Sequence, residues 1–556
     1  MNRRSNLLVL IGTVILLLSL AVPIMQCAPA AEDEVTPPAE EIKYGGRLNV
    51  GFRSEDMLEN LTFSSTMEYS TMGCLFYPMV YGRLWLLDYP PDYEAAPSLA
   101  TSWETPDGGK TWTFYLRDDV AWHDGVPFTA EDVAFTMEYL PEADPCWDYM
   151  DTRCEPGSIK VIDDYTVQFS LLEPIGEKYP AAYATPMLPK HIFEPHKDEI
   201  ATFQNEEAIG CGAFKLKEFK RDEYIWFEVN EHYFEGRPYV DEVIWMAYGS
   251  DDALNMALKS GEIHMIGANG IGRMAASDFE GLENVEMIVS PGLTMNWAVF
   301  NLYKSGPLQD VNVRKAIMHG IDRDEIIEMV YLGYAEKIDG VIYPEKSEHN
   351  PNLPQYDYNV DKANEILDEG GYLDTDGDGI RNDPTTGKNF VFELLVSSAQ
   401  TDTVKAATLC KEHLKGIGID IVPQVVDPAT YSAYIYAPTE GLFDIGFGGG
   451  GPGPCGDWIW EFFRSFESGG EGWNQAYYNN SEFDELLGKM YEATNPERTE
   501  YLYEMQEMVA NDLPYGYLYR PSILDPVRTE FDGYVSMMGG ISHWVAPYTY
   551  FDVHLR

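Results

Sequence analysis

The length of the chain is the feature that most limits how it can fold. Its 556 residues exceed what one hydrophobic core usually holds together, because single cores stop growing at roughly 250–300 residues. We therefore expect at least two lobes. Apolar residues make up 45% of the chain and aromatic residues 13%, which is enough to fill such cores and excludes a disordered acidic protein.

Acidic residues dominate the charge of the chain. The formal net charge is −53 at pH 7. A surface of this kind repels phosphate backbones, so we expect no nucleic-acid partner. We interpret the charge as a solvated acidic shell suited to saline or otherwise demanding external water, and attraction of cations is the alternative interpretation.

Residues 1–26 have the layout of an export signal. Arg3 and Arg4 come first, and a nearly unbroken apolar run extends from Leu7 to Met25. The run is also long enough to stay in the bilayer as a transmembrane anchor, since about 20 apolar residues span its hydrocarbon core. Both interpretations place the folded body outside the cytoplasm, anchored to the outer face of the cell membrane.

Cys27 follows this run directly. The stretch from Ile24 to Cys27 resembles the lipobox of lipoproteins, which implies a lipid anchor on Cys27, although Gln26 stands where a small residue is usual. Residues 27–43 contain a stretch rich in Ala, Pro and Glu without a periodic apolar face, which predicts a flexible tether. The folded body is expected to begin near Tyr44.

Six further cysteines are present, and an even number in an exported chain fits disulfides. Cys146 and Cys154 lie close together in a loop with proline and glycine, and we predict a local disulfide between them. A zinc site would need CxxC spacing or nearby histidines, and neither occurs. The sequence does not reveal how the remaining cysteines pair: Cys74, Cys211, Cys410 and Cys455.

Strand patterns dominate the first half of the chain. Strict alternation of apolar and polar residues is typical of half-buried strands, and Trp112, Phe114 and Leu116 follow it. The same alternation recurs at residues 167–171 and 225–229. After about residue 300 helices alternate with apolar runs, such as the one from Phe390 to Val396, which predicts an α/β lobe.

Capping patterns mark several helix starts. Asp322 followed by Glu325 predicts a capping box, in which the aspartate accepts from a free backbone amide and the glutamate reaches back. Ile326, Met329 and Val330 would then face the core. Similar patterns predict two later helix starts, at Ser481 with Asp484 and at Asn495 with Pro496.

Several stretches carry a resemblance to a known family. The longest covers residues 97–133 and reads PSLATSWETPDGGKTWTFYLRDDVAWHDGVPFTAEDV. Shorter ones follow: GCGAFKLKEF at 210–219, ALKSGEI at 257–263, DVNVRKAIMHGID at 310–322, and the segment 356–372. They resemble the extracellular solute-binding proteins of family 5, the peptide and nickel binders of ABC importers. The resemblance spans residues 44–556.

The resemblance implies a two-lobed α/β clam shell of the periplasmic-binding-protein type, class II, with an enlarged and discontinuous first lobe. The first lobe would hold residues 44–296 and 516–556, with an inserted subdomain at about 81–205. The second lobe would hold residues 297–515. Two connecting segments would then form a hinge about which the lobes close on a ligand.

The function implied is capture of a solute between the lobes, by a monomer, and delivery to an ABC importer permease. A peptide is the expected cargo, and an oligosaccharide is the alternative because stacked Trp and Tyr suit sugar faces. A nickel chelate is less favoured, since the histidines are scattered. Two further alternatives are a peptide hydrolase, for which the sequence offers no nucleophile with its base, and a sensory receptor.

Asp457 lies where peptide binders of this family carry an aspartate that holds the α-ammonium group of the ligand. A buried ammonium needs an opposite charge, because an unpaired buried ion is costly. A turn or helix-cap role is the alternative. Trp458, Trp473 and Tyr69 are candidate walls of the cleft, with core packing as the alternative. A core role is favoured for Trp460, and a strand and hinge role for Asn296 and Trp297.

Two other patterns are interpreted as structural. Asp374, Asp376 and Asp378 resemble the start of a calcium loop, but position twelve is Thr385 and no bidentate glutamate, so an acidic turn is favoured over a structural calcium site. His123 lies inside the longest family-like stretch, and we expect it to make structural hydrogen bonds. We expect no cofactor and no catalytic activity.

Overall fold

The computed structural model describes these residues: 42–61, 71–88, 94–143, 154–172, 174, 185–199, 203–451, 460, 462–465, 473–493, 496–542 and 548–556. Residues 42–556 form one compact unit. The export segment, Cys27 and Cys146 lie outside the described residues, so the predicted anchor and disulfide stay predictions. In the described part of the chain, no helix is both long enough and apolar enough to cross a bilayer.

A sheet of twelve strands runs through this unit. The strands pair in the order β16-β15-β17-β13-β18-β11-β1-β10-β9-β8, and β12 and β14 also pair with β18. Their bounds are β1 Arg47–Arg53, β8 Phe214–Lys220, β9 Tyr224–Val229, β10 Glu242–Tyr248, β11 Met265–Ile266, β12 Val285–Pro291, β13 Met295–Phe300, β14 Ala335–Lys337, β15 Val391–Ser397, β16 Asp420–Val426, β17 Ile445–Gly450 and β18 Tyr515–Arg528.

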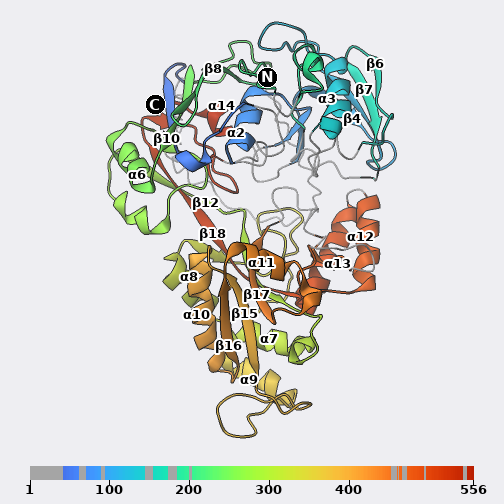
Figure 1. Ribbon diagram of the computed structural model, residues 1–556, viewed down its shortest axis with the longest axis vertical. Coiled ribbons are helices and arrows are strands. Elements are labelled where there is room, and N and C mark those ends of the chain that lie inside the picture. Colours follow the sequence, from blue (N-terminus) through green and yellow to red (C-terminus); the bar gives the residue numbers. More distant parts are fainter. Residues whose placement is uncertain are drawn as a thin grey trace, which may run out of the picture. The chain divides into compact units, whose positions relative to one another are not determined.

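Strand β18 belongs to both parts of this sheet. Its first half, up to Pro521, pairs with β13 and β14, and its second half, from Ser522, pairs with β12 and β11. Figure 1 shows β12 and β18 running between the strands near β10 and the strands β15–β17. The partners of β18 therefore change within one continuous strand, close to the predicted hinge. The predicted lobe boundaries themselves stay a prediction.

Smaller sheets accompany the large one. A four-stranded sheet pairs in the order β4-β5-β7-β6, and its β5 has Trp112, Phe114 and Leu116 buried, as the alternation predicts. The bounds are β4 Ala100–Glu104, β5 Thr111–Leu116, β6 Lys160–Asp163 and β7 Thr166–Ser170, with the two-stranded pairs β2 Trp85–Leu87 with β3 Ala95–Pro97 and β19 Phe531–Asp532 with β20 His554–Leu555.

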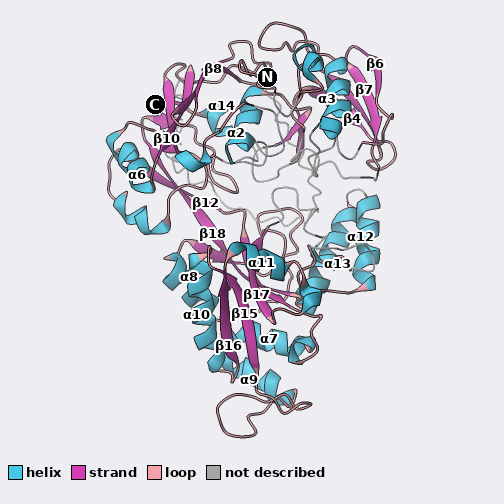
Figure 2. Ribbon diagram, in the orientation of Figure 1, coloured by secondary structure: helices cyan, strands magenta, loops and turns pink. Residues whose placement is uncertain are grey.

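Helices cover both faces of the strands that follow residue 295. Leu394 and Val396 of β15 point into a core shared with α7 to α10, whereas Leu395 points into a core that includes Ile435 of α11. Figure 2 shows α8 and α10 beside β15 and β16. The bounds are α2 Thr71–Val80, α3 Ala130–Ala143, α5 Lys190–Phe193, α6 Asp251–Ser260, α7 Val311–Gly320, α8 Arg323–Tyr331, α9 Val360–Glu369, α10 Thr401–Lys415, α11 Pro428–Ile435, α12 Ser481–Glu492, α13 Glu497–Asp512 and α14 Tyr548–Asp552.

The start of α8 matches the capping prediction only in part. Asp322 accepts a hydrogen bond from the Glu325 backbone amide at 2.9 Å, as predicted. The Glu325 carboxylate does not reach back, because it accepts from His413 of α10 at 2.8 Å. The prediction for Met329 is wrong: this side chain is 65% exposed, since it lies roughly a third of a turn from the stripe that holds Ile326 and Val330.

Two other predictions need correction. Helix α12 begins at Ser481, but the cap is Asn480, whose side chain accepts from Glu482 and Phe483. Asparagine and serine are both good caps, so the pattern alone placed the helix cap one residue too late.

Cys211 and Cys410 are free thiols buried among apolar side chains, so the expectation of disulfides fails for these two. Burial raises the pKa of the Cys211 thiol to about 12.

Asp525 in the second half of β18 is a buried carboxyl group. It is 2% exposed, and its Oδ2 accepts from the Ile541 amide at 3.0 Å. Burial raises its pKa to about 7. An unfolded aspartate ionises near pH 3.9. Between these two pH values only the unfolded chain carries the charge, so stability falls as the pH rises from about 4 to about 7 and then stays level.

Replacing Asp525 by Asn should therefore stabilise the folded protein at neutral pH. The Asp525→Asn variant keeps the acceptor for Ile541 and cannot ionise, so its stability relative to wild type should be about 3 kcal/mol higher at pH 8 than at pH 4.5. Thermal unfolding at the two pH values measures this difference. The exposed Asp164 provides the control, Asp164→Asn, which should show no such dependence. If the stability difference between the Asp525 variant and wild type were the same at both pH values, the raised pKa of Asp525 would be contradicted.

The acidic surface also predicts a salt dependence. Charges of one sign repel each other across the folded surface, and salt screens this repulsion. The melting temperature should rise by about 5 °C between about 0.05 M and about 0.5 M NaCl, because the Debye length falls over this range from about 14 Å to about 4 Å. Differential scanning calorimetry over a salt series measures the rise. A melting temperature that is flat over this range would mean that the acidic residues are spaced too widely to repel.

Candidate ligand-binding site

Most of the predicted site residues lie outside the described residues: Tyr69, Asp457 and Trp458. Trp473 is described and is 38% exposed. Its ring meets that of Tyr436 edge-on, with centroids 5.8 Å apart, and lies 5.6 Å from that of Phe462. Half-exposed aromatic rings of this kind offer a rigid surface to a ligand. The exposure of Trp473 is compatible with its predicted role in lining the ligand cleft, which remains a prediction.

The glycine run in β17 is explained by the strand beside it. Strand β13 pairs antiparallel with β17, and the register places Trp297 opposite Gly448. In the same register Val299 lies opposite Gly446, and Met295 opposite Gly450. Side chains of paired residues point to the same face. Large residues of β13 therefore lie beside glycines of β17, which leaves room above the glycine backbone.

Trp297 occupies this room. A Cβ on Gly450 would lie 2.7 Å from Cη2 of the Trp297 ring, and a Cβ on Gly448 would lie 3.2 Å from its Nε1. The indole thus extends along β17, and its centroid lies 5.8 Å from that of Phe462. Trp297 is 2% exposed, which agrees with the structural role expected from the sequence. Any side chain at Gly450 would collide with the ring.

The end of β17 is held by a second contact. Tyr343 donates a hydrogen bond through its hydroxyl to the Leu293 carbonyl, and both atoms lie where a side chain of Gly451 would project. Leu293 belongs to the connection between β12 and β13, which lies just before the predicted lobe crossing at residues 296 and 297. The glycine at 451 therefore lets the end of β17 approach this connection closely.

Sequence reasoning missed three residues of this region. Tyr431 of α11 donates through its hydroxyl to the Phe447 carbonyl at 2.8 Å. Gln475 is 3% exposed, and Tyr436, just after α11, is 42% exposed. The alternation of glycines at 446, 448 and 450 was the available signal, because it marks a strand face that a neighbouring large residue must cover.

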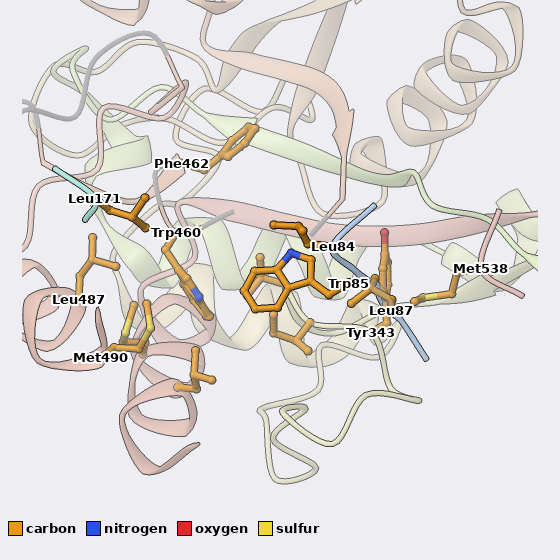
Figure 3. Close-up of a cluster of buried hydrophobic side chains, with 14 of the residues drawn as sticks. Leu84, Trp85, Leu87, Leu171, Tyr343, Trp460, Phe462, Leu487, Met490 and Met538 are labelled. Carbon is orange, nitrogen blue, oxygen red and sulfur yellow. The ribbon is translucent and has the colours of Figure 1, made fainter. Parts of the chain in front are cut away.

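Side chains from distant parts of the chain form one apolar cluster near this region. Figure 3 shows Leu84, Trp85 and Leu171 of the first part of the chain close to Trp460 and Leu487. Trp460 is fully buried, so the prediction that it packs in the core is confirmed.

His123 has a structural role, as expected. Its Nε2 lies 3.1 Å from the Gly212 carbonyl, and its Nδ1 accepts from the Gly210 amide at 3.3 Å. Burial lowers the pKa of His123 to about 4. The ring is therefore neutral at ordinary pH and connects the family-like stretch to the turn that precedes β8.

The Asp374 loop is an acidic turn. Oxygens of Asp374, Asp376 and Asp378 lie within 4.8 Å of one another, and all three residues are exposed. Asp374 accepts from the backbone amides of Gly377 and Gly379 at 2.7 and 3.0 Å, which lowers its pKa. Backbone amides therefore satisfy this carboxylate, as in an Asx turn, which fits the turn favoured from the sequence, and a structural calcium ion stays the untested alternative.

Comparison with known proteins first defines the class. The structure of the oligopeptide-binding protein AppA from Bacillus subtilis in complex with a nonapeptide superposes with a TM-score of 0.66 at 27% identity, and the match covers 93% of this chain and 100% of that one. A putative peptide binding protein AppA from Clostridium difficile shares the fold, with a TM-score of 0.74 at 22% identity over 91% and 100% of the two chains. The predicted two-lobed α/β binding-protein fold is confirmed.

The sequence comparison then gives the family. The family description "Bacterial extracellular solute-binding proteins, family 5 Middle" matches residues 94–471. The oligopeptide-binding protein AppA of Bacillus subtilis (strain 168) is 30% identical over 548 residues, which covers 96% of this chain and 97% of the relative. The chain belongs to the bacterial extracellular solute-binding proteins of family 5. Proteins of this family act outside the cytoplasm.

The packing of Trp297 on β17 makes a direct prediction. The Gly450→Ala variant places a methyl group against the indole, and overpacking of this kind costs about 1–3 kcal/mol of unfolding free energy. Urea unfolding of the variant measures the loss. Gly488→Ala in α12 is the matched control, since a Cβ there meets no atom within 4 Å, and alanine should stabilise the exposed helix slightly. Equal stability of Gly450→Ala and wild type would show that the ring moves freely.

Proposed function

We propose that this chain is the solute-binding component of an ABC importer and that it binds peptides between its lobes. The supporting observation is the similarity to a protein named as oligopeptide-binding, which extends over nearly the whole of both chains. Such a match includes both lobes and both connecting segments. The match therefore supports the proposal that the two proteins capture their ligands in the same way, and is more than the similarity of a single domain.

Capture would proceed by closure of the lobes about the β12–β13 connection and β18. Closure removes water from the ligand and orders it between two rigid surfaces, and few hinge residues need to change conformation. The apolar cluster near Trp460 and the aromatic pair of Tyr436 and Trp473 would line part of the space. The chain would act as a monomer, by binding alone and without covalent chemistry, and would present its solute to the permease.

Asp457 is proposed to hold the α-ammonium group of the peptide. A carboxylate makes short, charge-assisted hydrogen bonds with an ammonium group and offsets the cost of its burial. Trp458, Trp473 and Tyr69 are proposed to contact the rest of the peptide with little selectivity. The body would remain at the outer face of the membrane through a lipid on Cys27, with residues 27–43 as the tether.

Native mass spectrometry of the full-length protein in detergent tests this function. Wild type, challenged with separate pools of peptides and oligosaccharides, should retain peptides. Asp457→Ala should weaken peptide binding by about 30-fold or more, because it leaves the ligand ammonium buried without a partner. Glu369→Ala, at the exposed end of α9, removes the same charge far from the cleft and should bind as wild type does.

Two results would contradict the proposal that the chain binds peptides. Retention of oligosaccharides with no retained peptide would make the chain a carbohydrate receptor. Release of cleaved fragments from the peptide pool would make it a hydrolase. Peptide binding that is equally strong in Asp457→Ala and wild type would leave the cargo in place and remove the proposed amine anchor.

A further inference from the structure

One ion pair joins segments that the predicted boundaries assign to different lobes. Arg273 begins the 3-10 helix Arg273–Asp278 in the predicted first lobe, and Asp402 lies in the first turn of α10 in the predicted second lobe. The Arg273 guanidinium donates through Nη1 to the Asp402 carboxylate at 2.5 Å. The two residues are 129 positions apart in the chain, so the pair depends on how the two segments are placed relative to each other.

A tyrosine ring of the second lobe also contacts Arg273. The Arg273 Cζ atom lies 4.4 Å from the centroid of the Tyr331 ring, in α8. Such a cation–π contact adds to an ion pair when the cation is partly removed from water. The side chains of Arg273 and Asp402 are 22% and 31% exposed, so water and salt screen this pair less than a fully exposed pair.

Both ends of the pair are fixed close to β18. Two residues before Arg273, the Ile271 amide donates to the Leu524 carbonyl of β18 at 2.8 Å. On the other side the Tyr331 ring lies 4.7 Å from that of Tyr519, also in β18. Leu524 lies in the half of β18 that pairs with β12, and Tyr519 lies in the half that pairs with β13 and β14. The ion pair therefore bridges the point at which β18 changes its partners.

The ion pair and the apolar cluster near Trp460 lie on opposite faces of the strands that follow residue 295. Val396 of β15 points toward the face that α8 and α10 cover. Leu395 points to the other face, into the cluster that includes Trp460 and Leu171 of the first lobe (Figure 3). Contacts on both sides of a hinge strand together define one angle between the lobes. Rotation in either sense would change the distance between the two charges.

The charge of the two lobes opposes their approach. Residues 297–515 contain 38 acidic and 15 basic residues, and the rest of the body, 44–296 with 516–556, contains 48 acidic and 20 basic residues. Surfaces of the same sign repel each other as they come together. A direct pair of opposite charges between the lobes offsets part of this repulsion.

We propose that Arg273 and Asp402 form an ionic latch that favours the lobe arrangement described here, in which side chains of both lobes share one apolar cluster. The inference rests on the proposed capture function, because a protein that closes on its solute holds it while the lobes are in contact. A more open arrangement separates the two charges and loses the pair. The latch therefore raises the affinity for the solute without contacting it, since it increases the population of the arrangement that binds.

Single-molecule energy transfer on the full-length protein in detergent, without ligand, tests the latch. A ketone-bearing amino acid at Asp164 and at Glu485, one exposed position in each lobe, carries the two dyes. Arg273→Ala and Asp402→Asn should each raise the ratio of widely separated to closely spaced dyes about fivefold, the effect expected of one partly buried ion pair. The double variant should match the single ones, because each residue acts through the other.

Lys405→Ala is the matched control. Lys405 donates to the same carboxylate, with Nζ 3.0 Å from Asp402 Oδ1, but it belongs to the same helix as Asp402. Its loss removes one positive charge beside Asp402 and keeps the link between the lobes. The ratio of dye separations in Lys405→Ala should therefore stay within about twofold of wild type. Thermal unfolding of each variant confirms that it is folded.

Titration calorimetry with penta-alanine connects the latch to binding. The affinity of Arg273→Ala should fall below that of wild type by the same factor as the population with closely spaced dyes. An unchanged affinity beside a changed population would overturn the claim that the latch assists capture.

The outcomes separate the latch from the proposed function. A fivefold shift in the dye populations with no binding of penta-alanine or of the peptide pool keeps the latch and contradicts the peptide proposal. Populations of Arg273→Ala and Asp402→Asn that equal those of wild type would overturn the latch. A shift of both variants toward closely spaced dyes would also overturn it, because the pair would then favour the open arrangement.

Discussion

The backbone hydrogen bonds of β18 hold the molecule together. One strand of fourteen residues pairs with β13 and β14 along its first half and with β12 and β11 along its second. Both parts of the large sheet therefore depend on the same strand, and a bend of β18 near Pro521 and Ser522, where its partners change, would alter their relative orientation. An ion pair between Arg273 and Asp402 at 2.5 Å adds a side-chain link between segments far apart in the sequence. Motion about a paired strand keeps its ladder intact, so hinge movement need not cost backbone hydrogen bonds.

The glycine face of β17 shows how a strand with few side chains can still be closely packed. Glycine is poor in a strand because it has nothing to pack and loses more entropy on folding. Here a neighbouring tryptophan supplies the packing that the glycines lack, and it brings a polar N–H to the surface of the strand. The arrangement thus combines a filled core with a hydrogen-bond donor at a position where an ordinary strand would present a methyl group.

Local patterns in the sequence predicted local structure well. Alternation gave β5 and β7 with the correct buried residues, and Asp322 caps α8 as expected, because these features depend on residues a few positions apart. Family resemblance gave the two-lobed fold. Predictions failed where the deciding partner is distant. Glu325 bonds to His413, 88 residues away. The packing of Trp297 against Gly448 and Gly450 depends on the pairing of β13 with β17, which no local pattern connects.

The place of β18 in the chain has a consequence for how the protein is made. Its residues, 515–528, come almost last in a chain of 556. Neither part of the large sheet is complete until this segment is available, and such long-range pairing is slow because distant segments must meet first. During synthesis the chain would therefore stay incompletely folded until nearly all of it exists. That delay suits a protein that works outside the cytoplasm, since a chain without a finished sheet can still be threaded through a membrane channel.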